Sequence, residues 1–223
     1  MRAVVYGSRS DGHARVVIEL FASAELDLIG LIDDYPENAG RQIAGLVVLG
    51  TGRDVQRLAD DGIEGAVLGF GAARGRIAAM AAIEQAGLAL PILVHQTAQV
   101  AASAELAPGC QVLPGATVGP GARIGRGALV NTGAIVDHDV EIGDAAVIGP
   151  GVILTGRVTV GIEAEIGAGA VVLPDILLGA QTVVGAGAVV TRDVPAGITV
   201  AGVPARAREA ANIATVSPPA NDA

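Results

Sequence analysis

The 223-residue chain contains no tryptophan, two tyrosines and two phenylalanines, so aromatic residues make up only 2% of it. A core without rings must be filled by aliphatic side chains, and residues of the AVILMFWYC set account for 51% of the chain. This composition argues against ordinary β-sandwiches and helical bundles, whose cores carry large aromatic groups. The abundance of aliphatic residues and the 17% of charged residues also exclude a disordered chain.

The chain also lacks lysine, and its 14 basic residues, all arginine, are outnumbered by 23 acidic ones to give a net charge of −9. A net-acidic chain without a basic run is poorly suited to bind nucleic acid or an anionic membrane. No apolar run reaches the roughly 18 residues of a membrane span, and the N-terminus has too short an apolar run for a signal peptide. The single cysteine, Cys110, has no internal partner. We therefore expect a soluble, cytoplasmic protein.

A six-residue repeat occupies the second half of the chain. One aliphatic residue leads each of seventeen consecutive hexads, without an insertion, and glycine often follows it. The fifth residue of the hexad is small or branched. The lead residues are Val94, Val100, Leu106, Val112, Val118, Ile124, Val130, Val136, Ile142, Ile148, Leu154, Val160, Ile166, Val172, Leu178, Val184 and Val190.

This period predicts short strands separated by sharp corners. Three such strands form one triangular coil of eighteen residues, with the lead aliphatics stacked inside it. Glycines near the corners allow backbone conformations that other residues resist. We therefore predict an all-β parallel β-helix of five to six coils over residues 93–206, each rising about 4.8 Å.

The first part of the chain has a different pattern. Short apolar segments at 3–6, 26–32, 46–49 and 66–68 predict strands, and helical spacing appears at 14–24, 53–60 and 74–86. Strands that alternate with helices indicate a small parallel α/β sheet, with ligands at the carboxyl ends of its strands. We assign residues 1–92 to this domain, 93–206 to the β-helix and 207–223 to a tail that begins as a short helix.

Two short polar segments of the α/β part are candidate ligand sites. The loop from Gly7 through Asp11 and Gly12 to His13 lacks the Gly-x-Gly-x-x-Gly and Lys-Ser/Thr signatures. It is either a glycine-rich turn or a phosphate site at a helix start. Asp33 and Asp34 follow about twenty residues later, where carboxylates bind a ribose or base, or alternatively cap a helix or form a solvated turn.

Of the three histidines, His13, His95 and His138, the last is the candidate for chemistry. It occupies the third position of its hexad, at a corner, so its imidazole points away from the interior. It is either a solvated surface residue or a general base. Gly156, eighteen residues later, is predicted to lie above His138. It is either a glycine that the corner requires or a residue whose backbone N–H donates to an oxyanion. Asn131 is expected to bond the acceptor or orient His138, or else only to stack in the solenoid.

The repeats and the closing phrase from Ala201 to Arg206 resemble the hexapeptide-repeat acyltransferases, whose coil is left-handed. With the α/β part, the chain resembles the family of sialic-acid O-acetyltransferases and bacterial nucleotide-aminosugar N-acetyltransferases, which add a small Rossmann-like domain. The loop Gly7–Ala14 matches that family's Gly-x-x-Gly-His-Ala/Gly motif with two extra residues, and the double aspartate is present. The family's Gly-Asp/Asn-Asn segment is reduced to Gly71-Ala72-Ala73, although Arg76 remains.

The resemblance implies acetyl transfer from acetyl-CoA to the amino group of a nucleotide-linked amino sugar, without a metal, in polysaccharide biosynthesis. It makes His138 the general base and Asp139 the carboxylate that orients it. It further implies a homotrimer with sites between subunits. By position it assigns the nucleotide sugar to Asp11, Gly12, His13, Asp33, Asp34 and Gly71, and acetyl-CoA to Val147, Ala168, Ala186 and Arg206. Val147 replaces a second histidine of many members, and Arg206 either meets a coenzyme A phosphate or belongs only to the terminal turn.

Two other functions remain open at this point. One is O-acetylation of a sugar hydroxyl, which no residue distinguishes from N-acetylation. The other is a non-catalytic sugar-nucleotide-binding β-helix, which Val147 and the reduced Gly71 segment favour and the intact Asp137-His138-Asp139 phrase opposes. A β-helical zinc carbonic anhydrase is excluded, because its site needs three histidines and the coil contains only His95 and His138.

Overall fold

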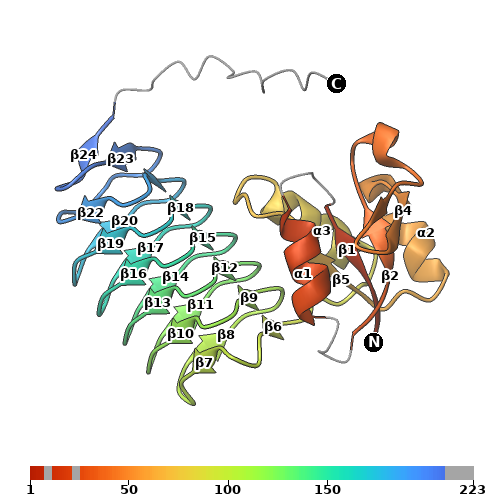
Figure 1. Cartoon of the computed structure of the whole chain (residues 1–223), viewed down its shortest axis with the longest axis horizontal. Coiled ribbons are helices and arrows are strands. Elements are labelled where there is room, and N and C mark those ends of the chain that lie inside the picture. The colour runs from red at the N-terminus through yellow and green to blue at the C-terminus, as the bar shows by residue number, and fades with distance from the viewer. Residues whose placement is uncertain (8–11, 22–25, 209–223) are drawn as a thin grey trace.

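The structure, a computed structural model, describes residues 1–7, 12–21 and 26–208 of the chain (Figure 1). An α/β part comes first, and a long prism of short strands follows it. The prism is a parallel β-helix of two-residue strands, as the repeat predicts.

The α/β part is built on one five-stranded sheet of order β3-β4-β2-β1-β5. Four strands are parallel: β1 (Arg2–Tyr6), β2 (Asp27–Ile32), β4 (Leu46–Gly50) and β5 (Gly65–Leu68). The fifth, β3 (Gln42–Ile43), pairs antiparallel with β4, so the expectation of a purely parallel sheet is wrong at this edge. Ala44 and Gly45 both have positive φ, at 48° and 85°, and such a two-residue turn joins antiparallel strands.

Helices cover this sheet near the predicted positions. They are α1 (His13–Phe21), α2 (Val55–Asp60) and α3 (Arg76–Gln85), with 3₁₀ turns at η1 (Pro36–Asn38) and η2 (Gly52–Asp54). Residues 22–25, which the helical spacing includes in the first helix, lie outside the described residues. Thr51 and Asp54 form a capping box at the start of η2. The side chain of each residue accepts a hydrogen bond from the backbone N–H of the other.

Between Leu93 and Val190, all of it described, the chain forms seventeen strands of two residues, and each strand ends on a predicted lead aliphatic. This confirms the hexad register throughout. The strands are β6 (Leu93–Val94), β7 (Gln99–Val100), β8 (Glu105–Leu106), β9 (Gln111–Val112), β10 (Thr117–Val118), β11 (Arg123–Ile124), β12 (Leu129–Val130), β13 (Ile135–Val136), β14 (Glu141–Ile142), β15 (Val147–Ile148), β16 (Ile153–Leu154), β17 (Thr159–Val160), β18 (Glu165–Ile166), β19 (Val171–Val172), β20 (Leu177–Leu178), β21 (Val183–Val184) and β22 (Val189–Val190).

Each strand from β6 to β19 pairs in parallel with the strand eighteen residues further on, as Leu129 with Val147, so the prism has three faces. We call the sheet of β6, β9, β12, β15, β18 and β21 the first face. The second face contains β7, β10, β13, β16, β19 and β22, and the third contains β8, β11, β14, β17 and β20. Corner one joins the first and second faces, and corner two joins the second and third.

The interior of the prism contains the lead residues and the small residues at the fifth position of the hexads. From Cys110 to Val200 they form one buried aliphatic cluster. Val94 is the exception, 39% exposed, because it belongs to the end coil and has no coil beneath it. The stack of aliphatic layers replaces the aromatic core that this composition cannot supply.

The α/β part packs on the first face of the prism. Outward residues of β6 and β12, Leu93 and Leu129, join one buried cluster with Val17 and Phe21 of α1. Phe21 also meets His95 edge-on, with ring centroids 6.4 Å apart. The first face is thus covered from within the same chain along β6, β9, β12 and β15, whereas Val183 of β21 is 38% exposed.

The end of the prism differs from the sequence expectation. Arg206–Ala207 form β24, which pairs antiparallel with β23 (Thr199–Ala201), so the tail does not begin as a helix at Ala207. An edge strand here satisfies backbone groups that the last coil would leave open. Residues 209–223 of the predicted tail lie outside the described residues. In the described ranges, no helix has the length and apolar character needed to cross a membrane.

Candidate functional site

His138 projects from corner two beside a carboxylate. Its Nδ1 lies 2.9 Å from Oδ2 of Asp139, and its side chain is 46% exposed. Asp139 adopts φ of 57°, and this left-handed corner turns its carboxylate back toward the preceding imidazole. With Nδ1–H donating to Asp139, Nε2 is left as a proton acceptor.

The coil above completes the surroundings of His138. A Cβ on Gly156 would collide with the imidazole, closest to Nε2, so only glycine leaves room for the ring here. This confirms that Gly156 stacks on His138. Within the described chain the Gly156 N–H has no acceptor, while its carbonyl accepts from the N–H of Asp175.

Charged side chains extend corner two beyond the imidazole. Arg157 lies one coil above Asp139 and donates from Nε and Nη2 to the two carboxylate oxygens of Asp175, at 2.6 and 2.8 Å. This bidentate bond holds the pKa of Asp175 below its ordinary value and the pKa of Arg157 above its own. Arg157 is therefore directed away from Asp139.

The residues expected to contact acetyl-CoA lie elsewhere on the prism. Ala168 and Ala186 are exposed and stacked at corner one, where the carbonyl of Ala168 accepts from the N–H of Gly187. Asn131 is at the same corner, before β13, and its Oδ1 accepts from the N–H of Thr132. Its side chain therefore does not orient His138, which follows β13 at the opposite end of the second face.

Val147 is the outward residue of β15 on the first face, packed against the cluster that contains α1. Nine residues are half of an eighteen-residue turn, so Val147 lies across the prism from the corner of His138. The two residues do not meet within one chain. Arg206 is exposed in β24, where its Nη1 donates to the carbonyl of Ala205, beside a cavity of about 160 Å³ that Arg192 and Asp193 also line.

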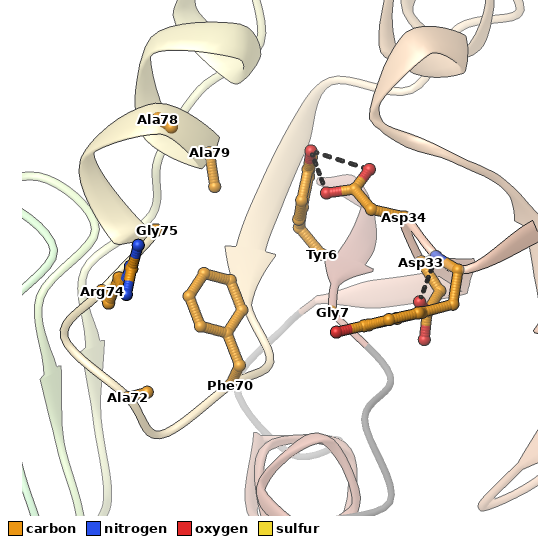
Figure 2. A pocket seen from close by; sticks show the side chains of 11 residues that line it. Tyr6, Gly7, Asp33, Asp34, Phe70, Ala72, Arg74, Gly75, Ala78 and Ala79 are labelled. Atoms are coloured by element: carbon orange, nitrogen blue, oxygen red, sulfur yellow. Dashed lines mark hydrogen bonds between the residues drawn. The ribbon is translucent and has the colours of Figure 1, made fainter. Parts of the chain in front are cut away.

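A larger cavity of about 350 Å³ opens in the α/β part, at the carboxyl ends of β1, β2 and β5 (Figure 2). Tyr6 and Asp34 line one side, and Phe70 stands between them and the start of α3. The Tyr6 hydroxyl donates to Oδ2 of Asp34 at 3.2 Å, and Asp34 also accepts from the N–H of Gly52. Burial, reinforced by the Asp34 carboxylate, raises the pKa of Tyr6 to about 12, which keeps the hydroxyl a donor.

The second aspartate of the pair has a different environment. Asp33 is buried and accepts from the N–H of Tyr35 at 2.8 Å and from Nδ2 of Asn38 at 3.0 Å. It therefore shapes the turn after β2 while it also lines the cavity. Asp33 thus organises a turn, as one of the two alternatives expects, whereas ligand binding by the pair stays a prediction for which Asp34 is exposed at the cavity.

The glycine-histidine loop meets the end of β5 and the prism. Gly12 has φ of 83°, and its carbonyl accepts from the N–H of Val16 at the start of α1. The His13 ring lies beside Gly71 and places Nε2 3.5 Å from Oε1 of Gln111 on the first face. Asp11 lies outside the described residues.

A buried arginine connects the cavity to the prism. Arg76 is fully buried and donates from Nε to the carbonyl of Gly127, from Nη1 to the carbonyl of Phe70 and from Nη2 to Oε1 of Gln111. Burial lowers the pKa of Arg76 to about 10. Gln111 also donates to the carbonyl of Leu68. This network fixes the floor of the cavity relative to the solenoid.

Sequence reasoning missed Tyr6, Phe70 and Arg74, which line the cavity. The available signal was the scarcity of rings, because three of the four aromatic residues, Tyr6, Tyr35 and Phe70, surround this one cavity. Tyr6 belongs to the buried core cluster and Phe70 packs against it, and rings that also line a cavity point to a ligand with a flat face.

Among the described residues, no group of three or more His, Cys, Asp or Glu side chains is arranged to hold a metal ion. What corner two provides is an imidazole–carboxylate pair with an open nitrogen and a nearby backbone donor. This arrangement can accept a proton from a nucleophile and stabilise an oxyanion.

Comparison with known proteins matches the prism to one family. The model of the bacterial transferase hexapeptide repeat (six repeats) matches residues 121–156, the segment that contains both His138 and Gly156. Among curated protein sequences, no significant match was found.

Solved structures resemble the whole chain. A mutant of perosamine N-acetyltransferase from Caulobacter crescentus, in complex with CoA and GDP-perosamine, is 34% identical, with a TM-score of 0.88 over 94% of this chain and 97% of that one. The acetyltransferase domain of PglB from Neisseria gonorrhoeae, with acetyl coenzyme A, is 34% identical, with a TM-score of 0.85 over 93% and 98%. WeeI from Acinetobacter baumannii is 25% identical, with a TM-score of 0.79 over 93% and 100%.

Proposed function

This chain belongs to the bacterial hexapeptide transferase family, and from that membership we propose that it transfers an acetyl group from acetyl-CoA to the amino group of a nucleotide-linked amino sugar. The observation that carries the proposal is the His138–Asp139 pair, set on Gly156. It occurs in a chain similar along its length to an N-acetyltransferase whose structure contains CoA and GDP-perosamine.

In the proposed reaction His138 is the general base. Asp139 accepts from Nδ1–H, so Nε2 takes the proton as the sugar amine attacks the thioester carbonyl carbon. A tetrahedral intermediate forms, its C–S bond breaks, and the thiolate of coenzyme A leaves with the electron pair. The proton on Nε2 is then available to that thiolate. The Gly156 N–H, which has no acceptor in the described chain, supports an oxyanion role.

We assign the nucleotide end of the acceptor sugar to a Rossmann-like domain of residues 1–92, and acetyl transfer to residues 93–206, with 207–223 as a tail. The aromatic residues and Asp34 at the cavity support this division of labour. Gly12, His13, Asp33 and Gly71 frame the same loop cluster. Asp11 is retained from the family resemblance alone.

The proposed active unit is a homotrimer with its sites between subunits. His138 projects from corner two, whereas the cavity and Val147 belong to the side of the prism where the α/β part packs. One chain therefore keeps the base away from the delivered sugar, and a second copy is needed to join them. Outward aliphatic residues on the second face, including Ile135 at 43% exposure, support such an interface. Ala168, Ala186 and Arg206 are then the proposed contacts of acetyl-CoA.

Replacing the base tests the proposal directly. We expect His138→Ala to lower turnover by about 10²–10⁴ with saturating substrates, the range for loss of a general base. Released thiol is followed with acetyl-CoA and a panel of nucleotide-linked amino sugars, each beside its hydroxyl analogue. The matched control is His95→Ala in the first coil, where Nδ1 bonds only the Thr97 side chain and backbone.

Near-normal turnover of His138→Ala would remove the base assignment. Activity on the hydroxyl analogues and none on the amines would replace N-acetylation by O-acetylation. Light scattering that shows a monomer would contradict the sites between subunits.

A further inference from the structure

Arg74 lies where two cavities of the molecule meet. It lines the 350 Å³ cavity together with Tyr6 and Asp34, and it also lines a groove of about 490 Å³ over β18 and β21 of the first face. In Figure 2 Arg74 and Gly75 lie on the α3 side of the cavity, opposite Tyr6 and Asp34, with Phe70 between the two sides. A ligand that leaves the cavity toward the groove must pass this guanidinium.

The guanidinium of Arg74 has no hydrogen-bond or ion-pair partner within the described part of the chain. Neighbouring arginines differ, since Arg76 is fully bonded to carbonyl and amide oxygens and Arg126 pairs with Glu84. In a chain with a net charge of −9, an arginine left without a carboxylate beside a cavity is available to an anion.

The charges around Arg74 differ between its two sides. The groove side carries the carboxylates of Glu163 and Glu165, and Glu165 already accepts from the N–H of Ala73. The cavity side contains the start of α3, whose cap is Gly75 and whose first turn therefore has no side-chain cap. The cavity also contains the carboxylates of Asp33 and Asp34, but these lie on the side opposite Arg74. An anion is therefore repelled from the groove and from the Asp34 side, and is stabilised at the Arg74 end of the cavity.

The two ends of the cavity match two parts of one ligand class. Rings and acceptors at Tyr6, Asp34 and Phe70 suit a base and ribose, whereas the Arg74 end suits phosphate oxygens. The loop of Gly71-Ala72-Ala73 before Arg74 has no polar side chain with which to bind phosphate. The Arg74 guanidinium supplies the phosphate-binding side chain that this loop lacks.

Resting on the proposed function, we propose that Arg74 binds the diphosphate of the nucleotide-linked sugar and thereby directs the sugar from the cavity into the groove. The residue is a determinant of affinity for the diphosphate and takes no part in proton transfer. Removing it should raise the KM for the nucleotide sugar and leave kcat at saturation within about twofold.

The test is isothermal titration of the full chain with UDP and GDP, and with UMP and GMP, which lack the second phosphate. We expect Arg74→Ala to weaken the binding of UDP or GDP by about 10- to 100-fold, the loss for a charged hydrogen bond. The monophosphates should lose much less. Arg74→Lys should fall between the two, because it keeps the charge without the fork. Coenzyme A, which carries its own diphosphate, should bind as before.

The matched control is Arg57→Ala on α2, which removes the same charge from the same part of the chain without lining the cavity. It should bind UDP and GDP as the wild type does. Equal diphosphate affinity in Arg74→Ala and wild type would overturn the inference and leave the proposed function standing. A wild-type chain that binds neither UDP nor GDP would overturn both, and equal losses in Arg74→Ala and Arg57→Ala would replace the specific contact by a general charge effect.

Discussion

The prism and the α/β part achieve order in opposite ways. In the prism, small aliphatic residues recur every six positions, and the interior from Cys110 to Val200 is one continuous apolar cluster. In the α/β part, individual polar residues such as Asp33 and Arg76 are buried at positions that do not repeat. Each of them has its own set of hydrogen-bond partners. Stability and chemistry are therefore separable in the prism, where corners point outward. They are coupled in the α/β part, where the same side chains shape the fold and the cavity.

The largest effect should come from the prism interior. Leu178 is fully buried, whereas its neighbour Leu177 on the same strand is 50% exposed. We expect Leu178→Ala to lower the free energy of unfolding by about 3 kcal/mol, because the packed layers cannot close the space. Leu177→Ala should change it by less than about 1 kcal/mol. Urea unfolding measures both, and equal losses would contradict the division between interior and surface.

At corner two, by contrast, a substitution should alter chemistry with little effect on folding. Gly156→Ala places a methyl group against the His138 imidazole, which can swing outward and so relieve the clash at small cost in stability. We expect turnover to fall by about 10²-fold, since the base is displaced from its productive position. The measurement is thiol release, with thermal unfolding as the control for folding. Unchanged turnover would show that the ring position is not critical.

In the α/β part, one change should affect both properties. Tyr6→Phe removes the hydroxyl that donates to Asp34 and should cost about 1 kcal/mol of stability. The pKa of Tyr6 is raised to about 12, so its folded form holds the proton more tightly. Its contribution is therefore complete below pH 10 and is lost as pH rises toward 12.

The check on Tyr6 is direct, because the chain has only two tyrosines. The difference in ultraviolet absorbance between wild type and Tyr6→Phe, followed against pH, reports the ionisation of Tyr6 alone. Ionisation near pH 10 would contradict the buried donor. Weaker binding of UDP or GDP by the variant would add that the hydroxyl serves the cavity as well as the fold.

The smallest effect is expected at the exposed ladder of corner two. Arg157 lowers the pKa of Asp175, so this carboxylate stabilises the fold above the ordinary pKa of aspartate, and the contribution disappears as pH falls through the lowered value. Asp175→Asn should lower the thermal midpoint slightly at pH 7. The difference from wild type should shrink as the pH is lowered below the ordinary aspartate range and Asp175 takes up its proton. A difference that does not depend on pH in this range would assign the effect to packing.

The same contrast explains how far sequence reasoning reached. All seventeen strands and the stacking of Gly156 on His138 followed from the period, because position around the prism depends only on residue number. The β3–β4 hairpin could not be predicted in this way, since β3 is a single two-residue strand outside any repeat and leaves no periodic signal. Nor could the cavity wall at Tyr6 and Phe70, because residues 64 positions apart in an aperiodic segment meet only through the sheet.

Within the prism itself, the structure does not bring Asn131 to His138 of the same chain, and a contact between Asn131 and the acceptor stays a prediction. Asn131 precedes His138 by seven residues, which places it at the other end of β13, bonded to the backbone of Thr132. An assignment by neighbouring hexad overlooks that a third of a turn separates consecutive corners. Pairing by eighteen residues, as for His138 and Gly156, is the rule that the geometry supports.

Each strand of the prism from β6 to β19 bonds to the strand eighteen residues further on. The number of inserted or deleted residues therefore decides on which face the following residues lie. Insertion of a single hexad between Leu113 and Asp137 would rotate the imidazole onto a different side of the molecule relative to Leu93 and Gln111, which the α/β part contacts. Insertion of three hexads would restore its bearing and move it only about 4.8 Å along the axis. Natural insertions and deletions that lie between the α/β part and His138 should therefore be multiples of eighteen residues. Those that lie after His138 should be multiples of six.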